Sequence, residues 1–214
     1  MKSNVLVLGA NGGTGHLIVS QALARGHQVT ALVRSAEKGR ALAGAKLIIG
    51  DARDEAVLRQ ALKGQDAVIS ALGTPASPFS EVTLLSTATA ALINAMKAEQ
   101  VPRLVCITGM GAGDSAGHGG FLFETLIYPL LLRKVYIDKN RQEDLVKASG
   151  LAWTLVRPSV LNNAAGKGHV RALTELGQFN GGSIAREDVA AFVLDQLGTN
   201  EWLHRAPLIT GAHA

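Results

Sequence analysis

The sequence is poor in cysteine and in aromatic residues. Its single cysteine, Cys106, excludes a disulfide within the chain. Aromatic residues make up only 4% of the sequence, and lysine and arginine are scattered along it instead of clustering with them. Because the formal net charge is also only +4, nucleic-acid binding has little support, and we expect no nucleic-acid partner.

Long apolar runs are absent too. The longest, residues 121–132, contains Glu124 and Pro129 and is too short to cross a bilayer. A strand pattern follows Met1 almost at once, without a basic and then apolar leader, so we expect a cytoplasmic protein with no membrane partner. The histidines show no ligand spacing and there is no cysteine pair, so we expect no metal site.

What the sequence does contain is a regular alternation of two patterns. At 214 residues, with 47% hydrophobic residues, it suits one compact domain over residues 1–214. Apolar runs predict strands near residues 4–8, 28–33, 46–50, 66–70, 102–107, 152–156 and 206–209. Helical patterns predict helices near residues 13–25, 54–62, 80–99, 121–149 and 186–197. This order is typical of βαβ units and predicts an α/β fold with a doubly wound parallel sheet.

The first strand runs directly into three spaced glycines. Gly9, Gly12 and Gly15 follow the apolar residues 5–8 and lead into a helical pattern. Glycine lets the backbone turn tightly and approach a pyrophosphate, and the N–H groups at a helix start attract anions. The G-x-x-G-x-x-G spacing at this position therefore predicts the phosphate loop of a Rossmann-type nucleotide-binding domain.

The residues after the second strand indicate which dinucleotide binds. An NAD site usually has Asp or Glu there, about 20 residues after the glycines, to hold the ribose diol. Here the sequence has Arg34 and Ser35. The guanidinium of Arg34 suits a 2′-phosphate, and the hydroxyl of Ser35 can add a hydrogen bond, which favours NADP over NAD. The alternative is an ordinary solvated arginine after a strand.

The ends of the other strands supply further candidates, because parallel sheets bind ligands there. Asp51 is placed to meet the adenine amino group, although Asp51 or Asp54 can equally cap the helix that follows. The small residues 70–75 suit a backbone that passes beneath a ribose and the pyrophosphate. Thr108 stands where a nicotinamide or substrate carbonyl would lie, or is simply a strand-end threonine. Residues 156–160 form a rigid turn whose backbone can bind the carboxamide.

Together these motifs resemble atypical short-chain dehydrogenases/reductases of the NAD(P)H-binding branch, which includes NmrA-like proteins and the biliverdin-IXβ and flavin reductases. The segments that carry the resemblance are residues 9–15, 30–34, 50–51, 70–73, 139–143, 149–158 and 184–189. The resemblance implies an NADP-binding fold, with the phosphates on residues 11–15, the 2′-phosphate on Arg34 and adenine near Asp51. It also places Arg186 and Asp188 in a structural segment, with Asp188 at a helix start.

The motifs and the resemblance together predict a cofactor site. Its members are Gly9, Ala10, Asn11, Gly12, Gly13, Thr14, Gly15, Arg34, Ser35, Asp51, Ala52, Ala71, Leu72, Gly73, Thr108, Lys139, Pro158, Ser159 and Val160. Two of them, Thr108 and Lys139, are also the predicted catalytic residues.

The family's catalytic tyrosine is missing. Standard members use Tyr-x-x-x-Lys, whereas here Val135 stands four residues before Lys139. Tyr136 is only three residues before Lys139, which turns its side chain about 100° around the helix, so it cannot be assumed to substitute. Lys139 either holds the nicotinamide ribose or is a surface lysine beside Asp138, and Thr108 stands in for the family's serine.

A site without a positioned acid suits particular substrates. A flavin, quinone or conjugated tetrapyrrole delocalises charge and takes its proton from solvent, whereas an isolated ketone needs an acid. We therefore expect an NADPH-dependent reductase of a flat conjugated small molecule, with a substrate pocket formed by residues 109–136 and 158–185. Residues 121–132 line this pocket, form a buried helix or form a dimer face, and we expect a monomer or a homodimer.

Other functions compete with this one. A non-catalytic NADP(H) sensor of the NmrA-like type would bind the same cofactor without turnover, and an epimerase-like activity is a third hypothesis. Residues 113–117 also match the G-x-S-x-G pattern of serine hydrolases, with His118 adjacent. A nucleophile elbow needs a strand-to-helix turn, but Ser115 falls in a glycine-rich loop beyond the predicted strand, which argues against a hydrolase.

Overall fold

The computed structural model describes residues 2–74, 82–118, 125–126, 132–177, 179 and 181–211. Eight strands form its main sheet, in the order β3-β2-β1-β4-β5-β6-β10-β8. Their bounds are β1 Asn4–Leu8, β2 Gln28–Val33, β3 Lys46–Ile49, β4 Ala67–Ser70, β5 Arg103–Ile107, β6 Ala152–Pro158, β8 Val170–Leu173 and β10 Leu208–Gly211. Neighbouring strands are parallel except β10 and β8, which are antiparallel. The short strands β7 (Val160–Asn162) and β9 (Ser183–Ala185) form a separate parallel pair.

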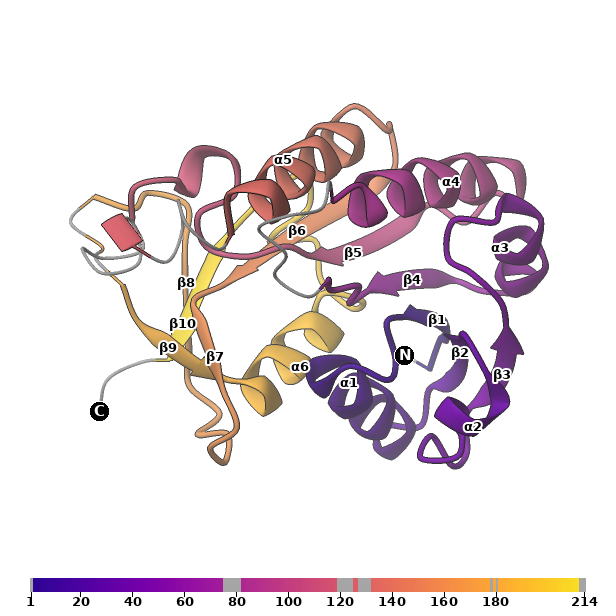
Figure 1. Ribbon diagram of the computed structural model, residues 1–214. Helices are drawn as coiled ribbons and strands as arrows, with labels where there is room; N and C mark the ends of the chain where they lie inside the picture. The colour runs from indigo at the N-terminus through magenta and orange to yellow at the C-terminus, as the bar shows by residue number, and fades with distance from the viewer. Residues whose placement is uncertain are drawn as a thin grey trace.

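Helices cover both faces of the main sheet (Figure 1). On one face, α1 (Gly13–Ala24) packs against α6 (Arg186–Asp195). On the other face, α4 (Leu84–Ala98) lies between α3 (Glu55–Leu62) and α5 (Arg133–Lys147). A single turn, α2 (Ala36–Gly39), connects β2 to β3, and a 3₁₀ turn spans Gly113–Ser115. The result is a three-layer α/β arrangement.

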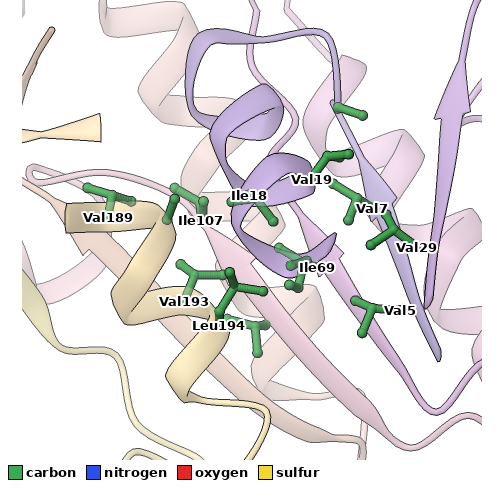
Figure 2. Close-up of a cluster of buried hydrophobic side chains, with 14 of the residues drawn as sticks. Val5, Val7, Ile18, Val19, Val29, Ile69, Ile107, Val189, Val193 and Leu194 are labelled. Atoms are coloured by element: carbon green, nitrogen blue, oxygen red, sulfur yellow. The ribbon is translucent and has the colours of Figure 1, made fainter. Parts of the chain in front are cut away.

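Two apolar clusters hold these layers together. Side chains alternate across a strand, so β1 directs Val5 and Val7 to one face and Leu6 and Leu8 to the other. Val5 and Val7 pack with side chains of α1 and α6 (Figure 2), and Leu6 and Leu8 pack with those of α3, α4 and α5. All four side chains are fully buried, which is why this strand reads as one continuous apolar run.

The predicted α/β fold with a doubly wound parallel sheet is confirmed. The helix predicted over residues 121–149 differs, because α5 begins only at Arg133, while residues 121–124 and 127–131 lie outside the described part of the chain. Four short elements, α2, β7, β8 and β9, were not predicted. Among the described residues, no helix is long and apolar enough to cross a membrane.

Candidate functional site

A cavity of about 1110 Å³ opens at the carboxyl ends of the parallel strands. The chain runs from β1 outward to β2 and β3 and returns to β4 on the other side of β1, so the ends of β1 and β4 form a topological switch point. The predicted site residues that line this cavity are Gly9, Ala10, Asn11, Gly12, Gly13, Thr14, Gly15, Arg34, Asp51, Ala52, Ala71, Leu72, Gly73, Thr108, Lys139 and Pro158. The structure thus brings together residues that are more than 140 positions apart in the sequence.

The glycine loop after β1 is packed tightly against the end of β4. Gly9 has a φ of +74°, and a Cβ on it would lie 2.3 Å from the carbonyl oxygen of Ala71. A Cβ on Gly15 would lie 2.1 Å from the carbonyl oxygen of Gly9. Real side chains do not tolerate such distances, so both glycines are required by the close approach of backbone to backbone.

The loop leads into α1 without a capping side chain. Its N-cap residue, Gly12, offers no side chain, no acidic residue occupies the first turn, and no other described residue is found capping it. The first N–H groups of a helix have no partner within the helix and carry a partial positive charge. The start of α1 therefore faces the cavity as a ready site for an anion such as a phosphate.

Two basic side chains line the cavity beyond the end of β2. Arg34 was predicted, and Lys38, at the end of α2, was missed because the single turn that carries it was not predicted. Ser35 does not line the cavity: its hydroxyl oxygen accepts a hydrogen bond from the backbone N–H of Lys38 at 3.4 Å and caps α2. The end of β2 is thus cationic, with no carboxylate of its own lining the cavity in the described structure.

The two aspartates after β3 have separate roles. Asp54 caps α3 by accepting hydrogen bonds from the backbone N–H groups of Ala56 and Val57. Asp51 lines the cavity and accepts hydrogen bonds from Arg53: one from the backbone N–H at 2.8 Å, and two from the guanidinium at 2.6 and 2.9 Å. These bonds lower the pKa of Asp51 to about 2. Of the two aspartates, Asp54 is therefore the cap of α3, and the contact of Asp51 with adenine stays a prediction.

Thr108, at the end of β5, belongs to a buried ionic network. Its hydroxyl donates a hydrogen bond to Glu143 Oε1 at 2.8 Å. Arg157 donates to both oxygens of Glu143, at 2.9 and 2.6 Å, and forms a further ion pair with Asp114 at 2.5 Å. Burial alone raises the pKa of Glu143, but the hydrogen bonds and charge of Arg157 outweigh burial and hold it below the usual range. No local pattern in the sequence indicates that these residues meet.

Lys139 and Asp138 are neighbours in α5 but point to different places. Lys139 lines the cavity, and its Nζ donates a hydrogen bond to the carbonyl oxygen of Thr108 at 2.5 Å. Burial lowers the pKa of Lys139. Asp138 is fully buried and accepts hydrogen bonds from the backbone N–H groups of Leu85 and Ser86 at the start of α4. Lys139 is therefore half-buried at the cavity wall and is not a solvated lysine paired with Asp138.

Tyr136 does not occupy the position of the missing tyrosine. Its ring is buried, it is not among the residues that line the cavity, and its hydroxyl donates a hydrogen bond to the carbonyl oxygen of Met110 at 2.6 Å. Val135, at the family's tyrosine position, is also buried. Neither side chain presents an acid to the cavity.

The end of β6 contributes less than the sequence predicted. Pro158 lines the cavity, together with Leu161, which was not predicted. Ser159 is buried and its hydroxyl donates to that of Thr210, while the side chain of Val160 is exposed, and neither lines the cavity. Much of the other expected substrate segment, residues 109–136, falls outside the described residues at positions 119–124 and 127–131.

The serine-hydrolase pattern has a structural role. Ser115 is completely buried in the 3₁₀ turn, where its hydroxyl donates to the carbonyl oxygen of Ala112 and accepts from the N–H of Gly111. The ring of His118 contacts the carbonyl oxygen of Phe179 instead of Ser115. In the described ranges, no group of three His, Cys, Asp or Glu side chains is arranged to hold a metal ion.

Known proteins are similar to this chain in sequence and in fold. A family model described as NAD(P)H-binding matches residues 9–200. A protein of Bacillus subtilis named as the uncharacterized sugar epimerase YhfK is 30% identical over 208 residues, which cover 94% of this chain and 91% of the relative.

Two solved structures illustrate the shared fold. ChuY, described as an anaerobilin reductase from Escherichia coli O157:H7, is 22% identical with a TM-score of 0.84 over 99% of this chain and 98% of that one. A short-chain dehydrogenase/reductase from Veillonella parvula, solved in complex with NADP, is 17% identical with a TM-score of 0.81, over 98% of this chain and 95% of that one. At these identities the two likenesses establish the fold alone, whereas the match over residues 9–200 places this chain in the NAD(P)H-binding family.

Proposed function

We propose that this protein is an NADPH-dependent reductase that transfers hydride to a flat conjugated acceptor such as a flavin or a quinone. The observation that carries the cofactor assignment is the pair Arg34 and Lys38, which line the cavity where an NAD site usually has a carboxylate. A 2′-phosphate at this position would meet two cations, one of them a planar fork suited to phosphate.

The charge of the whole cavity supports the same ligand. Five lysine and arginine side chains are among the lining residues of the described structure: Arg34, Lys38, Arg53, Lys139 and Arg186. Asp51 is the one carboxylate among the described residues that line the cavity, and it is already paired with Arg53. A cavity with such an excess of positive charge favours a polyanion. NADPH, with a pyrophosphate and a 2′-phosphate, has this character.

The chemistry that we propose follows from how the polar groups near the cavity are hydrogen-bonded. Bound NADPH supplies the hydride. The hydroxyl of Thr108 donates a hydrogen bond to the carboxylate of Glu143, and that of Tyr136 donates one to the carbonyl oxygen of Met110, so neither hydroxyl is directed at a substrate. Lys139 Nζ is held by the Thr108 carbonyl at the cavity wall, where we assign it to the nicotinamide ribose. An acceptor that delocalises charge and takes its proton from solvent suits such a site.

The cofactor assignment is tested with Arg34→Glu and the control Arg40→Glu. Both substitutions reverse an exposed charge in the same region, but Arg40 does not line the cavity. Dissociation constants for NADPH and NADH are measured by fluorescence titration. We expect Arg34→Glu to weaken NADPH by more than about tenfold and NADH far less, with Arg40→Glu close to wild type. Equal losses for NADPH and NADH would refute the 2′-phosphate role.

Turnover is tested by NADPH oxidation against flavins, quinones, a linear tetrapyrrole and simple aldehydes, with NADH in parallel. We expect oxidation with one or more of the conjugated acceptors and none with the aldehydes. Tight NADPH binding with no oxidation by any acceptor would overturn the reductase and favour a redox sensor. Reduction of aldehydes alone would show that a protein acid operates in the site.

A further inference from the structure

Arg186, the first residue of α6, reaches the glycine loop from the far end of the sequence. Its side chain is half-buried and lines the cavity with Gly12, Gly13 and Thr14. A Cβ on Gly13 would lie 3.1 Å from both Cδ and Nε of Arg186. Gly13 is not in the left-handed region, so its backbone does not require glycine, and the missing side chain leaves room for the arginine.

The charge of Arg186 has no carboxylate partner in the described structure. Its Nη1 donates a hydrogen bond to the neutral amide oxygen of Asn163 at 2.6 Å. The two acids that follow it are engaged elsewhere: Glu187 accepts from the backbone N–H of Gly166, and Asp188 from those of residues 167 and 168. Among the described ion pairs Arg186 is absent. An uncompensated guanidinium therefore lies next to the uncapped start of α1.

We propose that Arg186 binds the pyrophosphate of the dinucleotide and that Asn163 positions it for this contact. The anion would lie between the N–H groups at the start of α1 and the Arg186 guanidinium over Gly13. The helix terminus and the guanidinium would then both donate hydrogen bonds to the same anion. This inference rests on the proposed function, because it requires a dinucleotide in the cavity. It also differs from the purely structural role that the resemblance implied for this position.

The test compares Arg186→Met with Arg171→Met. Arg171 is exposed on β8 and does not line the cavity, so its substitution removes the same charge from elsewhere on the protein. Dissociation constants are measured calorimetrically for NADP, NAD and adenosine 2′-monophosphate, which has the 2′-phosphate but no pyrophosphate. We expect Arg186→Met to weaken NADP and NAD by a similar factor, on the order of tenfold, and to change adenosine 2′-monophosphate less than twofold.

Arg186→Lys and Asn163→Ala extend the test if Arg186→Met folds poorly. Arg186→Lys keeps the positive charge but loses the two-pronged hydrogen bonding of the guanidinium. Asn163→Ala keeps the guanidinium but removes the hydrogen bond that holds it in place. We expect each variant to lose less NADP affinity than Arg186→Met and more than Arg171→Met. Equal affinities of Arg186→Met and Arg171→Met for NADP, or an equal loss for adenosine 2′-monophosphate, would overturn the role of Arg186.

The two proposals fail in different ways. If wild-type protein binds NADPH and Arg34→Glu weakens that binding selectively, then unchanged NADP affinity in Arg186→Met overturns only the proposed contact between Arg186 and the pyrophosphate. If wild-type protein binds no dinucleotide phosphate at all, the proposed function itself is wrong.

Discussion

The carboxylate of Glu143 and the guanidinium of Arg157 form a buried ion pair, joined by two hydrogen bonds of 2.6 and 2.9 Å, with side chains only 1% and 3% exposed. The pair connects α5 to β6, and through the hydroxyl of Thr108 it also connects both to the end of β5. The cavity wall that holds Thr108 and Lys139 therefore depends on a buried charge pair.

We expect Glu143→Gln to lower the free energy of unfolding by about 3 kcal/mol. The substitution removes the buried carboxylate partner of Arg157 and also the ion pair of Glu143 with Lys147 at 3.3 Å. The loss stays at the lower end of the usual range because Asp114 still contacts Arg157. The matched control is Glu99→Gln, which breaks the more exposed pair with Arg59 and should cost less than about 1 kcal/mol. Urea denaturation measures both. Equal losses in the two variants would mean that the buried pair contributes nothing special.

The same pair predicts how stability depends on pH. Because the folded-state pKa of Glu143 lies below its ordinary value of 4.5, the unfolded chain takes up this proton first as the pH falls. The contribution of Glu143 is thus fully present above about pH 4.5 and is lost as the pH falls further, through the folded-state pKa. We expect the stability difference between wild type and Glu143→Gln to be constant from pH 7 to pH 5.5 and to shrink below about pH 4.5. A difference that grew on acidification would contradict the lowered pKa.

Tyr136→Phe tests whether Tyr136 replaces the missing acid, and Lys139→Met tests whether the amine at the cavity wall is needed for turnover. We expect Tyr136→Phe to leave kcat with a quinone or flavin within about threefold of wild type, because its hydroxyl is directed at the Met110 carbonyl and not at the cavity. Lys139→Met should lower kcat/KM by about tenfold or more, since the amine at the cavity wall is lost. Steady-state NADPH oxidation provides both values. A collapse of turnover in Tyr136→Phe alone would identify the tyrosine as the proton donor after all.

The sheet and the glycine loop were predictable because their causes are local. Strand β1 is apolar on both faces, as a strand between two helical layers must be, and Gly9 and Gly15 stand where backbone passes against backbone. The positions after each strand also follow once the sheet is known to be parallel, since their carboxyl ends share one edge. This is why most of the predicted site residues line a single cavity.

The remaining parts depend on contacts that local patterns do not encode. Glu143 and Arg157 meet only because α5 crosses back over β6, and Arg186 meets Gly13 only because α6 packs on α1. Lys38 escaped prediction because α2 is a single turn. The choice between Asp51 and Asp54 as helix cap was open in the sequence, since both side chains suit the position and only geometry distinguishes them.

The capping pattern has a consequence for how a ligand must lie. Three of the helices that start beside the cavity already hold a side-chain oxygen at their first turn: Ser35 on α2, Asp54 on α3 and, from a distant helix, Asp138 on α4. Within the described chain, α1 and α6 begin at the cavity without a side-chain cap, but α6 has two acidic residues in its first turn and α1 has none. Under the proposed function, the start of α1 is therefore the positive pole that the central phosphates of a dinucleotide would meet, with Arg34 and Lys139 at other parts of the same cavity.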